Sequence, residues 1–121
     1  MSDADELLLP DLQAALDLCG GTHELADVAQ ALRMGKAQYW SNGGAAIVTE
    51  LLQFPQLRTV NYWLVGGELR SALALSPRIE DWAREQGCVR AVALGRKGWA
   101  PHLIERGWSA PATGYRKELL S

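Results

Sequence analysis

Apolar residues in the first third of the chain recur at helical spacing on two segments that a pair of glycines separates. The first segment begins at Pro10, which suits the first turn of a helix, and the second follows Thr22, a favourable N-cap residue. The residues that share a face are Leu12, Ala15, Leu16 and Cys19 in the first segment and Leu25, Val28, Ala29 and Leu32 in the second. With Gly20-Gly21 as the turn and Gly35 as the stop, the pattern predicts a helical hairpin that lies against a sheet.

From residue 38 the pattern changes to that of strands. We expect strands at residues 38–40, 45–52 and 59–65, and the first turn contains Asn42-Gly43, a step that tolerates positive φ. Because the connections are short, the three strands should be antiparallel neighbours. Their nearly continuous apolar character predicts a sheet that is covered on both faces.

The second half alternates strand and helix. After Gly66-Gly67 we expect an open loop and then a helix that begins at Pro77, with Ser76 as its N-cap and Gly87 as its end. A strand at residues 89–94 should follow this helix. Strand, helix and strand in this order predict a crossover between two parallel strands.

The last part of the chain completes the predicted fold. A helix is expected over residues 99–106, ended by Gly107, and residues 114–120 are expected to pair at the sheet edge as a final strand. The whole of residues 1–121 should form one domain of the α/β (α+β) class. Its central sheet is expected to be mixed but mostly antiparallel, with helices on both faces.

Composition excludes several classes of function. The formal net charge of −2 argues against a nucleic-acid binder, and no apolar run approaches the roughly 20 residues that span a bilayer. The first six residues carry an acidic charge, whereas the start of a signal peptide is positively charged. Cys19 and Cys88 show no metal-ligand or redox spacing, so a reducing compartment is favoured over a disulfide. We expect a soluble, intracellular protein without membrane or nucleic-acid partners.

Few residues offer hydrolytic or metal chemistry. His23 and His102 are too few for a metal site, and no serine or cysteine sits in a nucleophile elbow or beside a histidine base. The five tryptophans lie in predicted strands and on helix faces, so most of them should be in the core. No metal is therefore expected, and a hydrolase is not supported.

The order of elements resembles the GNAT acyltransferase fold across nearly the whole chain. The segment from Trp99 to Trp108 looks like the last helix of that family, in which an aromatic residue follows a glycine. Three further phrases look like those of small GNAT-like proteins encoded by tailed phages and prophages. They are Gly66-Gly67-Glu68-Leu69, Trp82-Ala83-Arg84-Glu85-Gln86-Gly87-Cys88 and Gly95-Arg96-Lys97-Gly98-Trp99.

The resemblance implies a glycine-rich turn that presents backbone N–H groups to the pyrophosphate of CoA just before a helix. In this chain Gly66 and Gly67 lie about ten residues before the expected helix start at Pro77, so the usual loop is expected to be missing. The residues that could hold the cofactor instead are Gly66, Gly67, Arg70, Ser76 and Arg78. The alternative is that the two arginines are ordinary surface residues.

The family's general acid is a tyrosine four residues before the glycine of the last helix, and Leu103 stands at that place. Leucine cannot donate a proton. Glu50, on a central strand among apolar residues, is the candidate base, with an ordinary strand-end carboxylate as the alternative. Tyr115 could replace the missing acid if the last strand folds back toward the cleft.

These residues favour a non-catalytic role. The resemblance to phage proteins implies a virion-associated or assembly-associated module without a cofactor, in the cytoplasm of a bacterial host or in the virion. Its partners would be other phage or host proteins, docked on aromatic residues near the acyl-CoA cleft, for which Trp99, Trp108 and Tyr39 are the candidates.

Two other functions remain open. One is a divergent acetyl-CoA-dependent N-acyltransferase, and the other is a small-ligand sensor that binds without turnover. An exposed final strand would also offer an edge for a homodimer.

Overall fold

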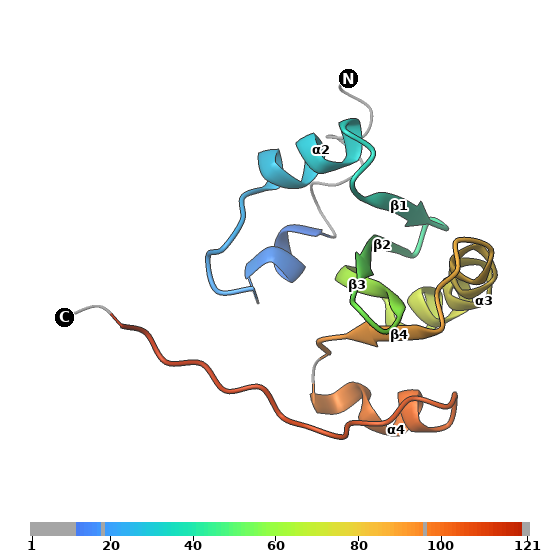
Figure 1. The fold of residues 1–121 in the computed structure, drawn as a ribbon. Coiled ribbons are helices and arrows are strands. Elements are labelled where there is room, and N and C mark those ends of the chain that lie inside the picture. The colour runs from blue at the N-terminus through green and yellow to red at the C-terminus, as the bar shows by residue number, and fades with distance from the viewer. Residues whose placement is uncertain (1–11, 18, 96, 120–121) are drawn as a thin grey trace.

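The computed structural model describes residues 12–17, 19–95 and 97–119. Residues 12–17 form a helix, and the elements after it are α2 (Leu25–Arg33), β1 (Gln38–Ser41), β2 (Ala45–Gln53), β3 (Arg58–Gly67), α3 (Leu69–Glu85), β4 (Arg90–Ala93), a 3-10 helix η1 (Lys97–Trp99) and α4 (Ala100–Ile104). Figure 1 shows the helix of residues 12–17 and α2 on one side of the sheet and α3 on the other.

The sheet has the order β1-β2-β3-β4. β1 with β2 and β2 with β3 are antiparallel, and β3 with β4 is parallel. The predicted mixed, mostly antiparallel sheet with helices on both faces is therefore confirmed. No helix in the described part of the chain has the length and apolar character needed to cross a membrane.

Each face of the sheet has its own core. We call the face under residues 12–17 and α2 the hairpin face; its buried residues are Leu12, Ala15, Leu16, Val28, Ala29, Ala37, Ala46, Val48 and Leu64. The α3 face holds Ala45, Ile47, Val60, Tyr62, Ala72, Leu75, Ile79, Ala83 and Cys88. The successive β2 residues Ala45 and Ala46 point to opposite faces, as alternation along a strand requires.

The prediction that a helix begins at Pro77 is wrong. α3 starts eight residues earlier, at Leu69, and Pro77 lies in its interior on the exposed side. An interior proline costs about 3 kcal/mol because it removes one backbone hydrogen bond and crowds the preceding turn. Extending the helix to Leu69 buries Ala72 and Leu75 against the sheet, and a fully buried leucine alone contributes about 2 kcal/mol. The free energy gained by burying these side chains thus offsets the cost of the interior proline.

The capping prediction for α2 is also wrong. Thr22 lies outside the helix, and Glu24 is the N-cap in a capping box in which Asp27 Oδ2 accepts the backbone N–H of Glu24 at 2.8 Å. The glycine ends are confirmed by positive φ angles of 73° at Gly35 and 87° at Gly87.

The end of the chain differs most from the prediction. Residues 114–119 form no strand and are exposed, so the expected final strand is absent there; residue 120 lies outside the described residues, as does Pro10. The last helix, α4, spans only Ala100–Ile104 and is preceded by η1. The five tryptophans are half-buried rather than fully buried.

Candidate functional site

The two parallel strands diverge after a short stretch of pairing. Residues Thr59 to Tyr62 of β3 pair with Arg90 to Ala93 of β4. β3 then continues to Gly67, whereas β4 ends at Ala93 and the chain turns away into η1. The sheet therefore opens at the carboxyl ends of two neighbouring parallel strands, the position where α/β proteins usually bind ligands.

An apolar pocket lies on the α3 face of this opening. Its lining residues are Ile47, Tyr62, Val65, Leu69, Ala72, Leu73, Ser76, Ala93, Trp99, Leu103 and Trp108. The cavity measures about 30 Å³. The edge of one ring meets the face of the other between Tyr62 and Trp108, with centroids 5.6 Å apart. Two tryptophans and a leucine from the last helical region thus narrow the pocket.

The first turn of α3 lies at the mouth of this pocket. Ala72 N donates to Glu68 O at 2.9 Å, which is the first bond of the helix, so the N–H groups of Leu69, Arg70 and Ser71 have no acceptor within the helix. Apart from the cap residue Glu68, whose side chain is exposed, the first turn carries no acidic residue. These amides and the positive end of the helix dipole favour an anion.

Two backbone contacts fix this turn against the β1–β2 hairpin. Gly67 has a φ of +94°, and a Cβ there would lie 2.6 Å from Gly44 O and 2.8 Å from Ala45 Cα, so only glycine fits. Asn42 Nδ2 donates to Ser71 O at 2.8 Å, and its Oδ1 accepts the N–H groups of Gly44 and Ala45. The start of α3 is therefore held by the strands rather than by a side-chain cap.

The predicted cofactor residues fall into two groups. Gly66, Gly67 and Arg70 lie at or next to the start of α3, which sequence reasoning had placed much later. The expectation that Ser76 caps a helix is wrong. Ser76 lines the pocket, and its Oγ lies 3.5 Å from the Tyr62 hydroxyl, whereas Arg78 lies farther along α3 with its guanidinium 6.0 Å from the Trp40 ring. Any role of these residues in binding stays a prediction.

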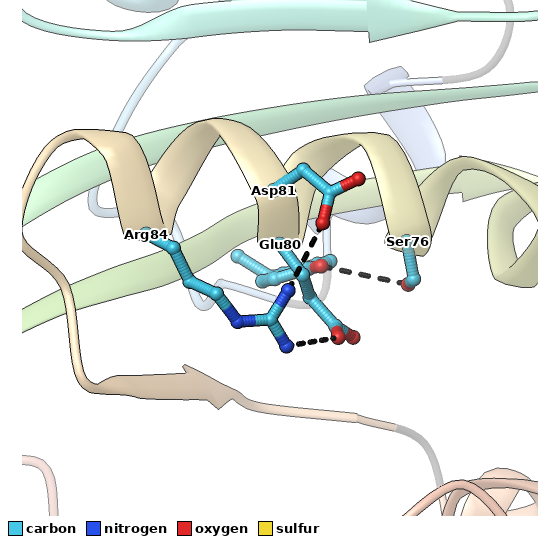
Figure 2. Close-up of polar contacts among 5 residues, drawn as sticks. Ser76, Glu80, Asp81 and Arg84 are labelled. Atoms are coloured by element: carbon cyan, nitrogen blue, oxygen red, sulfur yellow. Dashed lines mark hydrogen bonds and ion pairs between the residues drawn. The ribbon is translucent and has the colours of Figure 1, made fainter.

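Figure 2 shows the exposed side of α3 beyond Ser76, where Arg84 lies between Glu80 and Asp81. The two ion pairs measure 3.5 and 3.0 Å and run along the helix. Exposed pairs of this kind stabilise a helix only slightly. This cluster is a solvated surface and not part of the pocket.

Glu50 lies on the hairpin face. Its neighbours Thr49 and Leu51 contact the α3 face, so Glu50 points the other way, where Asn61 Nδ2 donates to its Oε1 at 2.9 Å. The carboxylate is half-buried. Sequence reasoning identified Glu50 but missed Asn61, although an asparagine within an apolar strand is a visible signal.

A β-bulge adjoins this pair. Val48 pairs with Leu64 and Thr49 pairs with Tyr62, so Trp63 is the extra residue on β3. The Trp63 ring meets the His23 ring edge-on at 4.9 Å, which connects the loop of the helical hairpin to the centre of the sheet. This pairing joins residues 40 positions apart and left no signal in the sequence.

No acid is supplied by the residues predicted for that role. Tyr115 is 95% exposed and lies in the tail, where no strand folds back, so the condition for its role is not met in this structure. Leu103, at the place of the family's tyrosine, lines the pocket. Tyr62 is the phenol that the pocket does contain; burial raises its pKa, the hydrogen bond to Ser76 lowers it and the charge of Glu80 raises it. Its hydroxyl is therefore protonated at neutral pH.

Two other expectations can be compared with the structure. Among the described residues, no group of three or more histidine, cysteine or acidic side chains could hold a metal ion. The predicted docking patch is not an exposed aromatic surface, since Trp99 and Trp108 line the pocket and Tyr39 packs against the hairpin-face core.

Comparison with known proteins identifies the fold. No protein-family model and no curated protein matches the sequence. Among solved structures, a GCN5-related N-acetyltransferase from Ralstonia eutropha is 20% identical with a TM-score of 0.67, and the match covers 97% of this chain and 93% of that one. A Trypanosoma brucei acetyltransferase is 15% identical with a TM-score of 0.64, covering 79% and 78%.

A GNAT family acetyltransferase from Staphylococcus aureus is 13% identical with a TM-score of 0.61, covering 98% of this chain and 93% of that one. At these identities the likeness concerns the backbone and not the site. The chain has the GNAT fold.

Proposed function

We propose that this chain binds an acyl-CoA in the opening between β3 and β4 and transfers a short acyl group to an amine. The observation that carries the proposal is that α3 begins at Leu69, with only the cap residue Glu68 between it and Gly66-Gly67. The strongest argument from sequence against a CoA site was the distance between these glycines and the helix. That distance does not exist in the folded chain.

The start of α3 suits the diphosphate of CoA. The N–H groups of Leu69, Arg70 and Ser71 converge at the positive end of a 17-residue helix, and the Arg70 side chain is exposed beside them. Glu68 is the one opposing charge in this turn; its carboxylate accepts a 3.4 Å bond from Ser71 Oγ. We expect this carboxylate to weaken anion binding.

The pocket supports a short acyl group. A cavity of about 30 Å³ leaves room for roughly two water-sized groups. Its lining is apolar, and the protonated hydroxyl of Tyr62 supplies a hydrogen-bond donor. Acetyl fits this space, whereas a long fatty chain would need Trp99 and Trp108 to move.

Glu50 is the carboxylate that the sequence offers as the base. Its hydrogen bond from Asn61 fixes it on the face of the sheet opposite the pocket, next to the β-bulge at Trp63, so it can accept a proton only from an amine that enters the β3–β4 opening from that face. An amine must lose a proton to attack a thioester, and a positioned carboxylate can accept it directly or through water. Leu103 occupies the place of the family's acid, so the leaving thiolate would take its proton from solvent, and we therefore expect slow turnover.

Calorimetric titration of acetyl-CoA and CoA tests the binding site. The sharpest variant is Leu69→Pro, because proline is tolerated at the first helical position and Glu68, with φ −81° and ψ 132°, has the extended conformation that precedes proline. It removes one N–H from the anion site, and Leu69→Ala is the matched control for the lost side chain. We expect Leu69→Pro to bind about tenfold more weakly than Leu69→Ala, as for one charge-assisted hydrogen bond.

Two charge variants complete this test. Glu68→Gln should strengthen binding of CoA and Arg70→Ala should weaken it, each by about threefold to tenfold at low salt. Absence of heat with the native chain at millimolar acetyl-CoA would refute the proposal.

Turnover is measured separately, by release of free CoA thiol in the presence of small primary amines. Glu50→Gln should abolish turnover and leave acetyl-CoA binding unchanged. Unchanged turnover in this variant would remove Glu50 as the base.

The second candidate is the non-catalytic module of phage or prophage origin, in the host cytoplasm or the virion, with phage or host proteins as partners. Leu103 in place of an acid and two tryptophans in the pocket favour it. Millimolar acetyl-CoA raises the melting temperature of a protein that binds it, and leaves such a module unchanged. A ligand sensor would show the shift without turnover.

A further inference from the structure

β4 is an edge strand with backbone groups that face outward. The sheet ends with β4, and Val89 N donates to Arg58 O of β3 at 3.0 Å. Successive N–H groups of a strand point to opposite sides, so those of Arg90 and Val92 point to the open edge. An uncovered edge of this kind is a template for another strand.

The open edge is also flanked by exposed apolar side chains. Val89 is 75% exposed, Val92 is 37% exposed and Leu94 is 96% exposed. The other edge strand, β1, differs. Its apolar members are half-buried, and polar residues, Gln38 and Ser41, stand at its two ends. Among the described strands, β4 is therefore the edge that most needs a cover.

The tail of the same chain, residues 109–119, pairs with no strand among the described residues. Residues 109–119 are exposed at every position and form neither helix nor strand. Tyr115 and Leu119 are 95% and 87% exposed. Arg116 pairs with Glu118 at 3.4 Å within the tail and lies beside Gly20.

The course of the tail separates it from its own β4. Figure 1 shows the tail, in orange to red, passing below α4 and extending along the outside of the molecule, and the Arg116 side chain lies against Gly20. Within the described residues, each chain thus has the unpaired sheet edge at β4 and one extended segment without strand pairing. β4 spans four residues, roughly 13 Å, and the 11 residues of the tail exceed that length.

We propose that two copies of this chain form a two-fold dimer by exchanging tails, with residues 113–119 of each copy paired along β4 of the other. Exchange satisfies both free edges at once, as an isologous interface requires. It also covers Val92 and Leu94 and gives Tyr115 and Leu119 a surface to pack on. This inference is independent of the proposed acyl transfer.

Sedimentation velocity and light scattering on the full chain test the dimer. We expect the native protein to be dimeric at micromolar concentration. Val92→Pro removes an N–H that points to the open edge and leaves the β3 side of β4 intact, so it should yield a folded monomer by circular dichroism. Val92→Ala keeps the N–H and should remain dimeric. The proposal would be overturned if the native protein stayed monomeric up to about 100 micromolar, on the order of the highest useful concentration. It would also be overturned if the Val92→Pro variant were dimeric.

A tail variant guards against misfolding of the edge variant. Arg116→Pro with Lys117→Pro changes two adjacent residues, so it removes a pairing N–H in either register, in a segment outside the cores of the sheet. It should also be monomeric, and a dimer formed by this variant would overturn the proposal.

Mixing the two variants gives the most specific readout. The Val92→Pro chain keeps its tail and the double-proline chain keeps its edge, so a 1:1 complex should form at concentrations where neither associates alone. Failure of the mixture to associate, with both chains folded, would show that the interface is elsewhere. Protection of the tail amides in a native monomer would show instead that the tail folds back on its own β4.

Discussion

The hairpin face and the α3 face of the sheet share the same strands but are packed in different ways. The fully buried residues of the hairpin face are all aliphatic, and its half-buried aromatic residues, Tyr39 and Trp63, pack around them. On the α3 face, by contrast, Trp40, Trp82, Tyr62 and Trp108 meet in pairs with ring centroids 5.5 and 5.6 Å apart.

The pocket that could receive a ligand is bordered by one of these ring pairs. Tyr62 and Trp108 meet edge to face there, an arrangement that aromatic pairs prefer. The pocket lies on the α3 face, where the strands also diverge. On the hairpin face, the corresponding feature is a polar one, the hydrogen-bonded pair of Glu50 and Asn61 beside the β-bulge.

The largest expected effect concerns the backbone at the pocket mouth. Gly67→Ala should lower the free energy of unfolding by about 3 kcal/mol, because the residue needs a positive φ and its Cβ would overlap the backbone of Gly44 and Ala45. Gly43→Ala has a φ of +87° but open space around it, so it should cost about 1 kcal/mol. Urea unfolding measures both. Equal losses would show that the contact with β2 is not what fixes the start of α3.

Opening the α3 face should change both stability and acyl preference. Trp108→Ala removes a half-buried ring from the pocket and should cost about 2 kcal/mol. It should also shift the preference among acyl-CoA ligands toward longer chains, by about tenfold for each added methylene accommodated. Trp63→Ala, on the hairpin face, is the control. If Trp63→Ala caused a similar shift in acyl preference, the acyl group would lie on the hairpin face and not in the pocket on the α3 face.

Two buried threonines distinguish the faces by their hydrogen bonds. Thr49 Oγ1 accepts from Trp40 Nε1 at 3.0 Å and donates to Gln38 at 2.9 Å, whereas Thr59 Oγ1 has no partner among the described residues. Thr49→Val should destabilise the protein by about 1.5 kcal/mol, and Thr59→Val should stabilise it by about 1 kcal/mol. Urea unfolding should show changes of opposite sign in the free energy of unfolding of the two variants. A lower free energy of unfolding in both would indicate that the Thr59 hydroxyl does have a hydrogen-bond partner.

The smallest effect is the pH dependence of the α3 face. Burial raises the pKa of Tyr62 above its ordinary value of about 10, so the unfolded chain releases this proton first. Stability contributed by the neutral phenol is complete below pH 10 and is lost as the pH rises toward the folded pKa. Tyr62→Phe should therefore show a shallower loss of stability as the pH rises above about 10.

Cys88 is the control for this measurement. Its pKa is also raised by burial, against a lowering by Arg58, so Cys88→Ala must be compared over the same range. An unchanged alkaline slope in Tyr62→Phe would show that the phenol is hydrated in the folded protein.

Much of the fold could be predicted from local pattern. The periods of the apolar residues located the helical hairpin, the three antiparallel strands and the parallel β4, and glycines marked the ends of helices, because these signals involve neighbouring residues only. The tail was predicted as a strand from similar signals. A strand also needs a pairing partner, however, and residues 114–119 do not pair with any strand among the described residues.

The candidate site was only partly visible. Glu50 and Gly66-Gly67 could be singled out from the sequence, but the sequence placed the glycines far from the helix that they precede. The error came from Pro77, whose local preference for a first turn is real. His23 and Trp63 are brought together by the hairpin packing alone.

The sequence by itself determined the number, order and type of most elements, and hence the mixed sheet covered on two faces, since hydrophobic period is a property of short segments. Only the tertiary structure decided that α3 starts at Leu69, that Glu50 meets Asn61 on one face while Tyr62 meets Trp108 on the other, and that the tail forms no strand. These features depend on free energy gained by burying residues that are distant in sequence, which can exceed the roughly 3 kcal/mol cost of an interior proline.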